Sequence, residues 1–192
     1  MKKHKIPLQT KIIVLLSSIF LFLLIKNTFG YQDFSLTVYT SSFDGYSISY
    51  SSDFFLKEAH GLNSVVTLTN YDSTEPFNFI PTDSLFALDI VALDNPKRLS
   101  IEQFWQWHDK NNFEGTSIKT VVHSVTPITV NSKNGVLREI TTLATVWEAL
   151  IDGGDKIYLL AARKDEKFES IFNQILYSFR IEGENIGGNI EE

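Results

Sequence analysis

The chain has 192 residues, of which 43% are hydrophobic and 13% aromatic, and it contains no cysteine. This composition excludes a disordered chain, disulfide bonds, thiolate metal sites and lipid modification of a cysteine. Five of the 17 Lys and Arg residues but none of the 23 Asp and Glu residues lie in residues 1–30, so residues 31–192 carry 12 − 23 = −11. This negative charge disfavours nucleic acid and anionic lipid as partners of that part.

The first predicted element is an apolar helix over residues 12–25, which contain no charge and lie between Lys11 and Lys26. As a helix it would cover ~21 Å, less than the ~30 Å of a hydrocarbon core. The basic residues before it are typical both of a secretory signal peptide and of a signal anchor. Both interpretations place the rest of the chain on the extracytoplasmic side. The predicted membrane segment includes Ile12, Leu16, Phe20 and Leu24.

Cleavage after Gly30 would release the domain as a secreted or periplasmic protein, whereas retention would tether it to the cell membrane. We therefore divide the chain into a signal peptide or anchor (1–30), a linker that could pair at a sheet edge (31–42), a folded domain (43–182) and a flexible tail (183–192).

Three strands are predicted in the first half of the domain. Tyr46, Ile48 and Tyr50 alternate with serines, which indicates a half-buried strand, and residues 65–69 form a β-branched run. Residues 85–93 are apolar on both faces apart from Asp89, as expected of a central strand. Residues 70–83, between the last two strands, are predicted to form a long loop.

A helix is predicted after residue 100, because Ser100 and Gln103 form a capping box. Its inner face comprises Ile101, Phe104, Trp105 and His108. Trp105 and Trp107 are two residues apart and cannot share one helical face. We therefore predict that Trp107 is exposed, and both tryptophans are candidate contacts for a partner, with Trp107 first.

The second half is predicted to form an antiparallel meander and a closing helix. Residues 121–125 and 128–130 are interpreted as two short strands around Pro127, followed by a hairpin turn over residues 131–135 that Asn134 and Gly135 supply. A second hairpin turn is predicted between Asp152 and Asp155. The closing helix is identified by its apolar stripe of Phe168, Ile171, Phe172, Ile175, Leu176 and Phe179. This order of elements predicts an α+β fold with an antiparallel β-sheet flanked by helices.

Two segments resemble a known family. Residues 44–54 (DGYSISYSSDF) are similar to the opening strand of PsbP-like domains of the Mog1/PsbP fold, and residues 172–180 (FNQILYSFR) are similar to their closing helix. Ser51 stands where the family usually has proline. The resemblance covers residues 43–182 and implies an α/β/α sandwich in an extracytoplasmic accessory protein. Most members of the family have no known catalytic activity, and the resemblance assigns no functional residue.

Asp89 is the most unusual charged residue, because a carboxylate in an apolar strand needs a partner or a place at the rim. Arg138 is the predicted partner. Together with His108 these two residues define a candidate pocket, although a structural salt bridge or an edge position is the favoured explanation of Asp89. The histidines lack the spacing of a helical metal pair, and Asp152 and Asp155 suit a turn better than a calcium loop. We predict no metal and no cofactor.

The sequence contains no nucleophile elbow, phosphate loop or dinucleotide fingerprint. We therefore predict a membrane-tethered or exported PsbP-like domain that serves as a non-enzymatic accessory or protein-binding module of the cell envelope. The alternative is a small-ligand-binding protein or hydrolase with a pocket near Asp89 and His108.

Overall fold

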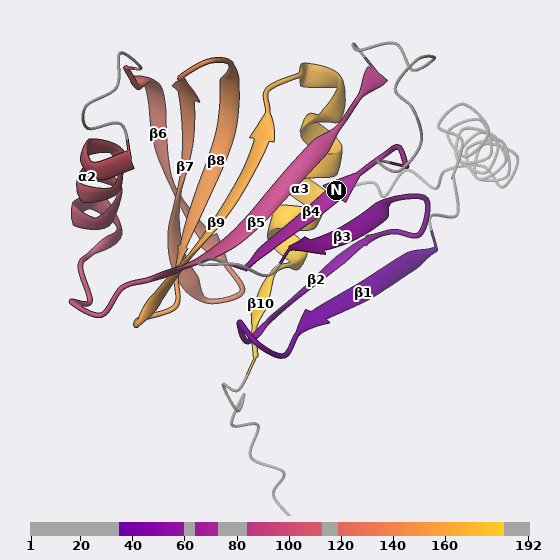
Figure 1. Ribbon diagram of the computed structural model, residues 1–192, viewed down its shortest axis with the longest axis horizontal. Helices are drawn as coiled ribbons and strands as arrows, with labels where there is room; N and C mark the ends of the chain where they lie inside the picture. Colours follow the sequence, from indigo (N-terminus) through magenta and orange to yellow (C-terminus); the bar gives the residue numbers. More distant parts are fainter. Residues whose placement is uncertain (1–34, 60–63, 73–83, 113–118, 183–192) are drawn as a thin grey trace, which may run out of the picture. The chain divides into compact units, whose positions relative to one another are not determined.

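The computed structural model describes residues 35–59, 64–72, 84–112 and 119–182. Two antiparallel sheets and two α-helices make up this part (Figure 1). The small sheet has the order β1-β2-β10, and the large sheet has the order β3-β4-β5-β9-β8-β7-β6. The strands are β1 (Leu36–Ser41), β2 (Tyr46–Ser51), β3 (Phe55–Ala59), β4 (Val65–Thr69), β5 (Ala87–Asp94), β6 (Val121–Val130), β7 (Lys133–Thr141), β8 (Thr145–Asp152), β9 (Lys156–Arg163) and β10 (Arg180–Ile181).

The helices are α2 (Ile101–Asn112), the short 3-10 helix η3 (Glu166–Phe168) and α3 (Glu169–Ser178). The predicted antiparallel α+β architecture is confirmed, since every strand pair is antiparallel. The predicted apolar segment at residues 12–25, with Ile12, Leu16, Phe20 and Leu24, lies outside the described residues. Among the helices of the described ranges, none has the length and apolar character needed to cross a membrane.

Part of the predicted linker is a strand of the fold. Residues 36–41 pair with β2 from Leu36 opposite Ser51 to Ser41 opposite Tyr46. The sequence analysis had suggested that this linker could pair at the edge of a sheet, and β1 does so. The assignment of residues 36–41 to a linker is therefore corrected, because the folded unit begins at Leu36.

Two predictions about the β6–β7 hairpin were wrong. β6 is one continuous strand through Pro127, which pairs with Val136 at the edge of the large sheet. An edge strand accepts proline because half of its N–H groups face away from its neighbour. The turn lies within the predicted range 131–135, but it is made by Asn131 and Ser132, whose φ angles of 46° and 71° suit a tight hairpin turn, whereas Asn134 and Gly135 belong to β7.

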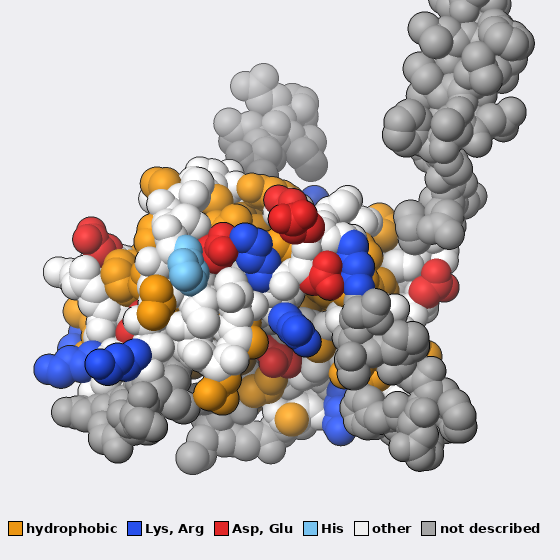
Figure 2. Space-filling view, turned by 90° about the horizontal axis from the view of Figure 1, so that it is seen from above, with side chains coloured by type: hydrophobic (Ala, Val, Ile, Leu, Met, Phe, Trp, Pro, Cys, Tyr) orange, Lys and Arg blue, Asp and Glu red, His pale blue; other side chains and the backbone are white. Residues whose placement is uncertain are grey.

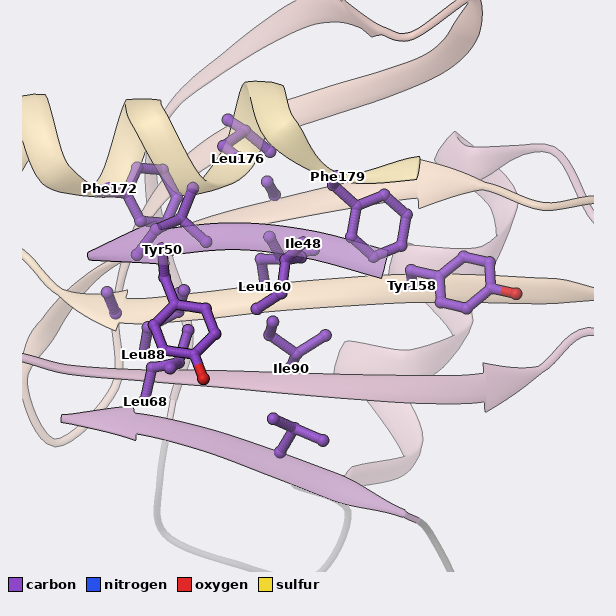
Figure 3. Close-up of a cluster of buried hydrophobic side chains, with 14 of the residues drawn as sticks. Ile48, Tyr50, Leu68, Leu88, Ile90, Tyr158, Leu160, Phe172, Leu176 and Phe179 are labelled. Atoms are coloured by element: carbon purple, nitrogen blue, oxygen red, sulfur yellow. The ribbon is translucent and has the colours of Figure 1, made fainter. Parts of the chain in front are cut away.

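The main hydrophobic core lies where α3 and β2 meet one face of the large sheet (Figure 3). The stripe predicted for the closing helix is confirmed, since Phe168, Phe172, Ile175, Leu176 and Phe179 are buried and Ile171 packs against them. Side chains of Ile48 and Tyr50 from β2 meet Leu88, Ile90 and Leu160 from the sheet. Asp165 caps η3 by accepting a bond from the Lys167 amide over 3.2 Å.

A smaller core forms under α2. Phe104 of α2 packs with Leu150 of β8 and Ile157 of β9, and all three are buried. Leu150 lies between Ala149 and Ile151, which belong to the main core, so strand alternation places α2 on the other face of the large sheet. The face seen in Figure 2 carries acidic and basic side chains among hydrophobic ones.

Candidate functional site

The helix α2 begins with the predicted capping box. The Ser100 amide donates to Gln103 Oε1 over 3.1 Å, and the Gln103 amide donates to Ser100 Oγ over 3.3 Å. The predicted inner face is also confirmed: Phe104 is buried and Ile101, Trp105 and His108 are partly buried. Trp107 has 50% of its surface exposed, as predicted.

An apolar hollow lies between α2 and the loop that follows β5. Its volume is about 80 Å³, and its lining residues are Asp94, Asn95, Pro96, Lys97, Leu99, Phe104 and Trp107. The rings of Phe104 and Trp107 are tilted against each other with centroids 5.8 Å apart. The exposed indole of Trp107 therefore has the buried Phe104 ring behind it and an opening beside it.

Asn95 fixes the loop that forms this hollow. Its side chain accepts a bond from the Leu99 amide over 2.9 Å and donates to the Leu99 carbonyl over 3.0 Å. It also donates to the Gly154 carbonyl over 3.2 Å, while its own amide donates to the Asp155 carbonyl over 2.7 Å. Although polar, Asn95 is 2% exposed, so these bonds replace water and make the loop rigid.

A buried ion cluster lies under the same helix, around Arg138. The guanidinium has no exposed surface and donates from Nε to Glu148 Oε2 over 2.8 Å, and Nη2 contacts the same oxygen. On its other side, Nη1 donates to Asp109 Oδ2 over 2.9 Å and Nη2 to Asp109 Oδ1 over 3.2 Å. The guanidinium carbon lies 4.8 Å from the centre of the Trp105 ring. Trp105 thus covers the cluster, and Trp107 is the more exposed of the two tryptophans of α2.

The pKa values of Asp109 and Arg138 are both shifted in this cluster. Burial alone would raise the pKa of Asp109, but its contacts with His108 and Arg138 outweigh burial, and the pKa of Asp109 is lowered. Burial works against the charged form of Arg138, yet the two carboxylates raise the pKa of its guanidinium. His108 lies at the edge, with Nδ1 3.8 Å from Asp109 Oδ1 and its ring stacked on Phe104 at 5.9 Å.

Asp89 does not belong to this cluster, and its predicted pairing with Arg138 was wrong. Its Oδ1 accepts a bond from Thr67 Oγ1 over 2.7 Å on the exposed part of β5. Asp89, Ala161, Glu148 and Arg138 are successive register partners across β5, β9, β8 and β7. Three strand spacings separate Asp89 from Arg138, which is ~14 Å. The structure thus brings His108 and Arg138 together through Asp109 and leaves Asp89 apart.

The remaining sequence candidates have structural roles or lie elsewhere. His123 Nε2 is 2.8 Å from Thr141 Oγ1, and His60 is outside the described residues. The predicted turn at residues 152–155 is confirmed, with Asp152 Oδ1 accepting a bond from the Gly154 amide over 2.8 Å. Within the described ranges, no group of three or more His, Cys, Asp or Glu side chains is arranged to hold a metal ion.

Sequence reasoning missed the partners of Arg138 and most of the hollow. Arg138 and Glu148 are charged residues placed symmetrically about the turn between β7 and β8, so the pair could have been found by matching the hairpin's two halves. The hollow could not be found in this way, because the loop after β5 has to fold back beside α2, and Asn95 ties this loop to the turn between β8 and β9.

These observations define a class of protein: an antiparallel α+β domain in which an apolar hollow lies beside an exposed tryptophan. No protein-family model and no curated protein matches the chain. Cyanobacterial PsbP (CyanoP) from Synechocystis sp. PCC 6803 is similar in structure, with a TM-score of 0.53 and 13% identity over 79% of this chain and 95% of that chain. The Ran-binding protein Mog1p of Saccharomyces cerevisiae has a TM-score of 0.47 and 10% identity over 77% and 96%.

The similarity to CyanoP confirms that the chain has a PsbP-like fold, as the resemblance of residues 44–54 and 172–180 implied. An identity of 13% shows the fold and no more, because one fold hosts many unrelated functions. Any function must therefore be argued from this chain's own site.

Proposed function

We propose that this chain is a non-enzymatic, protein-binding module of the cell envelope that contacts its partner through Trp107 and the hollow beside it. The carrying observation is the indole of Trp107, 50% exposed on the rim of an apolar hollow. Tryptophans in such positions often supply a large share of the binding energy in protein interfaces. The surrounding backbone is held by buried hydrogen bonds, so binding need not order it.

Residues 12–25 support a place at the membrane in this proposal. Their uncharged sequence, preceded by basic residues, suits either a cleaved signal or an anchor, and both would export the domain. We favour the anchor, since Thr28 and Gly30 form a weaker cleavage signal than two alanines. Mass spectrometry of the mature protein tests this choice: an intact N-terminus in the membrane fraction supports the anchor, and an N-terminus at Tyr31 rejects it.

The alternative, a ligand pocket or hydrolytic site near Asp89 and His108, has less support. Asp89 is exposed and bonded to Thr67, while both sides of the Arg138 guanidinium are occupied by carboxylates. Neither Asp89 nor His108 lines the hollow beside Trp107. An acid and a base that do not face one open space cannot act on one substrate.

Crosslinking in intact membranes tests the proposal. We expect the wild-type chain to capture a reproducible partner, and Trp107→Ala to lose it. Tyr177→Ala is the matched control, because Tyr177 is an aromatic residue of similar exposure, 52%, on the other helix. The proposal fails if the wild type captures no reproducible partner, or if Trp107→Ala captures it as well as Tyr177→Ala does.

A further inference from the structure

We infer that the free edge of β1 pairs with β1 of a second copy of this chain, in an antiparallel register centred on Val38, so that two small sheets join into one. This inference goes beyond the proposed function, because it concerns a different surface from the hollow beside Trp107. Three features of β1 carry it: its open edge, its exposed apolar side chains and its lack of charge.

β1 is the outer strand of the small sheet, whose order is β1-β2-β10. In the described ranges no strand pairs with its outer edge, and Figure 1 shows β1 at the periphery of the described elements. Alternate residues of an antiparallel strand direct their N–H and C=O groups away from the neighbouring strand. β1 therefore presents a row of backbone donors and acceptors to which another strand can bond.

The two edge strands of the large sheet have features that discourage pairing with another strand, whereas β1 has none of them. β6 contains Pro127 and a register shift between Val122 and Ser124. β3 contains Lys57 and Glu58. Prolines, bulges and charges are the usual means by which natural edge strands avoid other strands. β1, with the sequence LTVYTS, has no charge and no proline, and it pairs with β2 without a register shift. Short segments of this kind pair readily with copies of themselves.

Two apolar side chains on one face of β1 are exposed beside small polar residues. Leu36 is 54% exposed and Val38 is 65% exposed. Their register partners on β2 are Ser51 and Ser49, which are too short to cover them. If a second β1 pairs with this edge, its own Leu36 and Val38 lie opposite or diagonal to these side chains, within contact distance. The pairing would thus bury apolar surface that the single chain leaves in water.

The sequence of β1 suits a two-fold axis at Val38. Residues directly opposite each other in antiparallel strands lie on the same face, so a strand that pairs with its own copy must be centred on a residue. The axis at Val38 places Val38 opposite its copy, Leu36 opposite Thr40 and Thr37 opposite Tyr39. All of these are aliphatic, β-branched or aromatic pairs. No like charges meet, although the domain as a whole is negatively charged.

The membrane anchor proposed above would favour a second copy over another protein. Ten residues, 26–35, separate the apolar segment 12–25 from β1, and ten residues span at most about 35 Å. Two anchored copies would therefore hold their β1 strands within the same distance of one membrane. Confinement of this kind raises the effective concentration of each strand for the other.

Engineered cysteines test the register, since the chain has no cysteine of its own. The full chain carrying Val38→Cys is oxidised mildly in nonionic detergent and analysed by non-reducing electrophoresis. We expect a reducible dimer, because residues facing each other across two strands have Cα atoms about 4.5 to 5.5 Å apart, within the range of a disulfide. Val121→Cys is the matched control, because Val121 is a valine of the edge strand β6 with 51% exposure. It should give at least about tenfold less dimer.

The oligomeric state of the full chain in the same detergent is the second measurement. Light scattering with absorbance and refractive-index detection gives the mass of the protein without the detergent. We expect a wild-type dimer that dissociates on dilution. Val38→Lys places two ammonium groups opposite each other and should raise the dissociation constant of the dimer at least about tenfold. Val121→Lys makes the same change on β6 and should leave the dimer intact.

Several results would overturn the inference. A wild-type chain that stays monomeric at every concentration would do so, and so would equal dimer yields for Val38→Cys and Val121→Cys. If the wild type is a dimer that Val38→Lys does not weaken, the two copies meet at another surface. If Val38→Cys stays monomeric and its thiol is protected from a maleimide, another segment of the same chain covers the edge, and pairing between copies is rejected.

Discussion

Arg138 on β7 and Glu148 on β8 are register partners, and Arg138 Nε donates to Glu148 Oε2 over 2.8 Å although the arginine side chain has no exposed surface. Asp109 of α2 reaches the same guanidinium from the opposite side. One cation therefore joins two adjacent strands to the helix that carries Trp107. The ion cluster sets the position of α2 and, through it, the geometry of the hollow.

Removing this cation should destabilise the domain strongly. Arg138→Met leaves Glu148 and Asp109 facing each other with their charges uncompensated, and loss of one member of a buried ion cluster typically costs ~3–5 kcal/mol. Arg163→Met, at an exposed position on β9, should change the free energy of unfolding by less than ~0.5 kcal/mol. Urea unfolding followed by circular dichroism measures both. Equal stabilities for the two variants would show that the cluster is not a structural anchor.

The lowered pKa of Asp109 predicts how this contribution depends on pH. A carboxylate whose pKa is lower in the folded than in the unfolded state stabilises the fold above its unfolded value of about 3.9. This stabilisation is lost as the pH falls through the folded pKa. Asp109→Asn should therefore lower the free energy of unfolding at neutral pH by ~1–3 kcal/mol, and the difference from wild type should shrink in acid.

The measurement is a set of urea unfolding curves from neutral pH to below the ordinary carboxyl range. Asp53→Asn is the control, because Asp53 is an exposed carboxylate in the turn after β2. Its free energy of unfolding should follow that of the wild type at every pH. A difference between Asp109→Asn and wild type that widens in acid would contradict the assigned direction.

The two tryptophans of α2 should separate stability from binding. Trp105 lies over the Arg138 guanidinium, so Trp105→Ala should lower the free energy of unfolding by about 2–3 kcal/mol through lost packing and the lost cation–π contact. Trp107→Ala should cost less than ~1 kcal/mol, because half of its ring is already in solvent. Thermal unfolding of both variants checks the contrast, and similar losses would mean that Trp107 serves mainly to hold the helix.

Sequence patterns predicted correctly those features that depend on residues close together in the chain. The capping box of Ser100 and Gln103, the buried stripe of α3 and the exposure of Trp107 all follow from helical spacing, and the structure confirms them. The partner of Asp89 depends on which strand lies beside β5. That order is set by long-range pairing, so the sequence could not reveal Thr67. The hollow was missed for the same reason, since it requires the loop after β5 to fold against α2.

Gly135 lies inside strand β7 and not in the β6–β7 turn, so the need for glycine at this position has another cause. Asn134 and Gly135 resemble a hairpin turn, yet Gly135 sits within β7 opposite Ile151. A Cβ atom there would lie 2.8 Å from the Leu150 carbonyl oxygen and 3.0 Å from Ile128 Cγ1. The first contact is with backbone, which cannot rotate away, so the strands would have to separate.

Gly135→Ala should therefore lower the free energy of unfolding by ~1–3 kcal/mol, the usual cost of overpacking, despite the better strand propensity of alanine. Asn134→Ala is the matched control: its side chain is exposed, and the change should cost less than ~0.5 kcal/mol. If instead glycine were needed only for a flexible turn, both substitutions would have small effects. Chemical unfolding of the two variants decides between a close contact inside the sheet and a turn requirement.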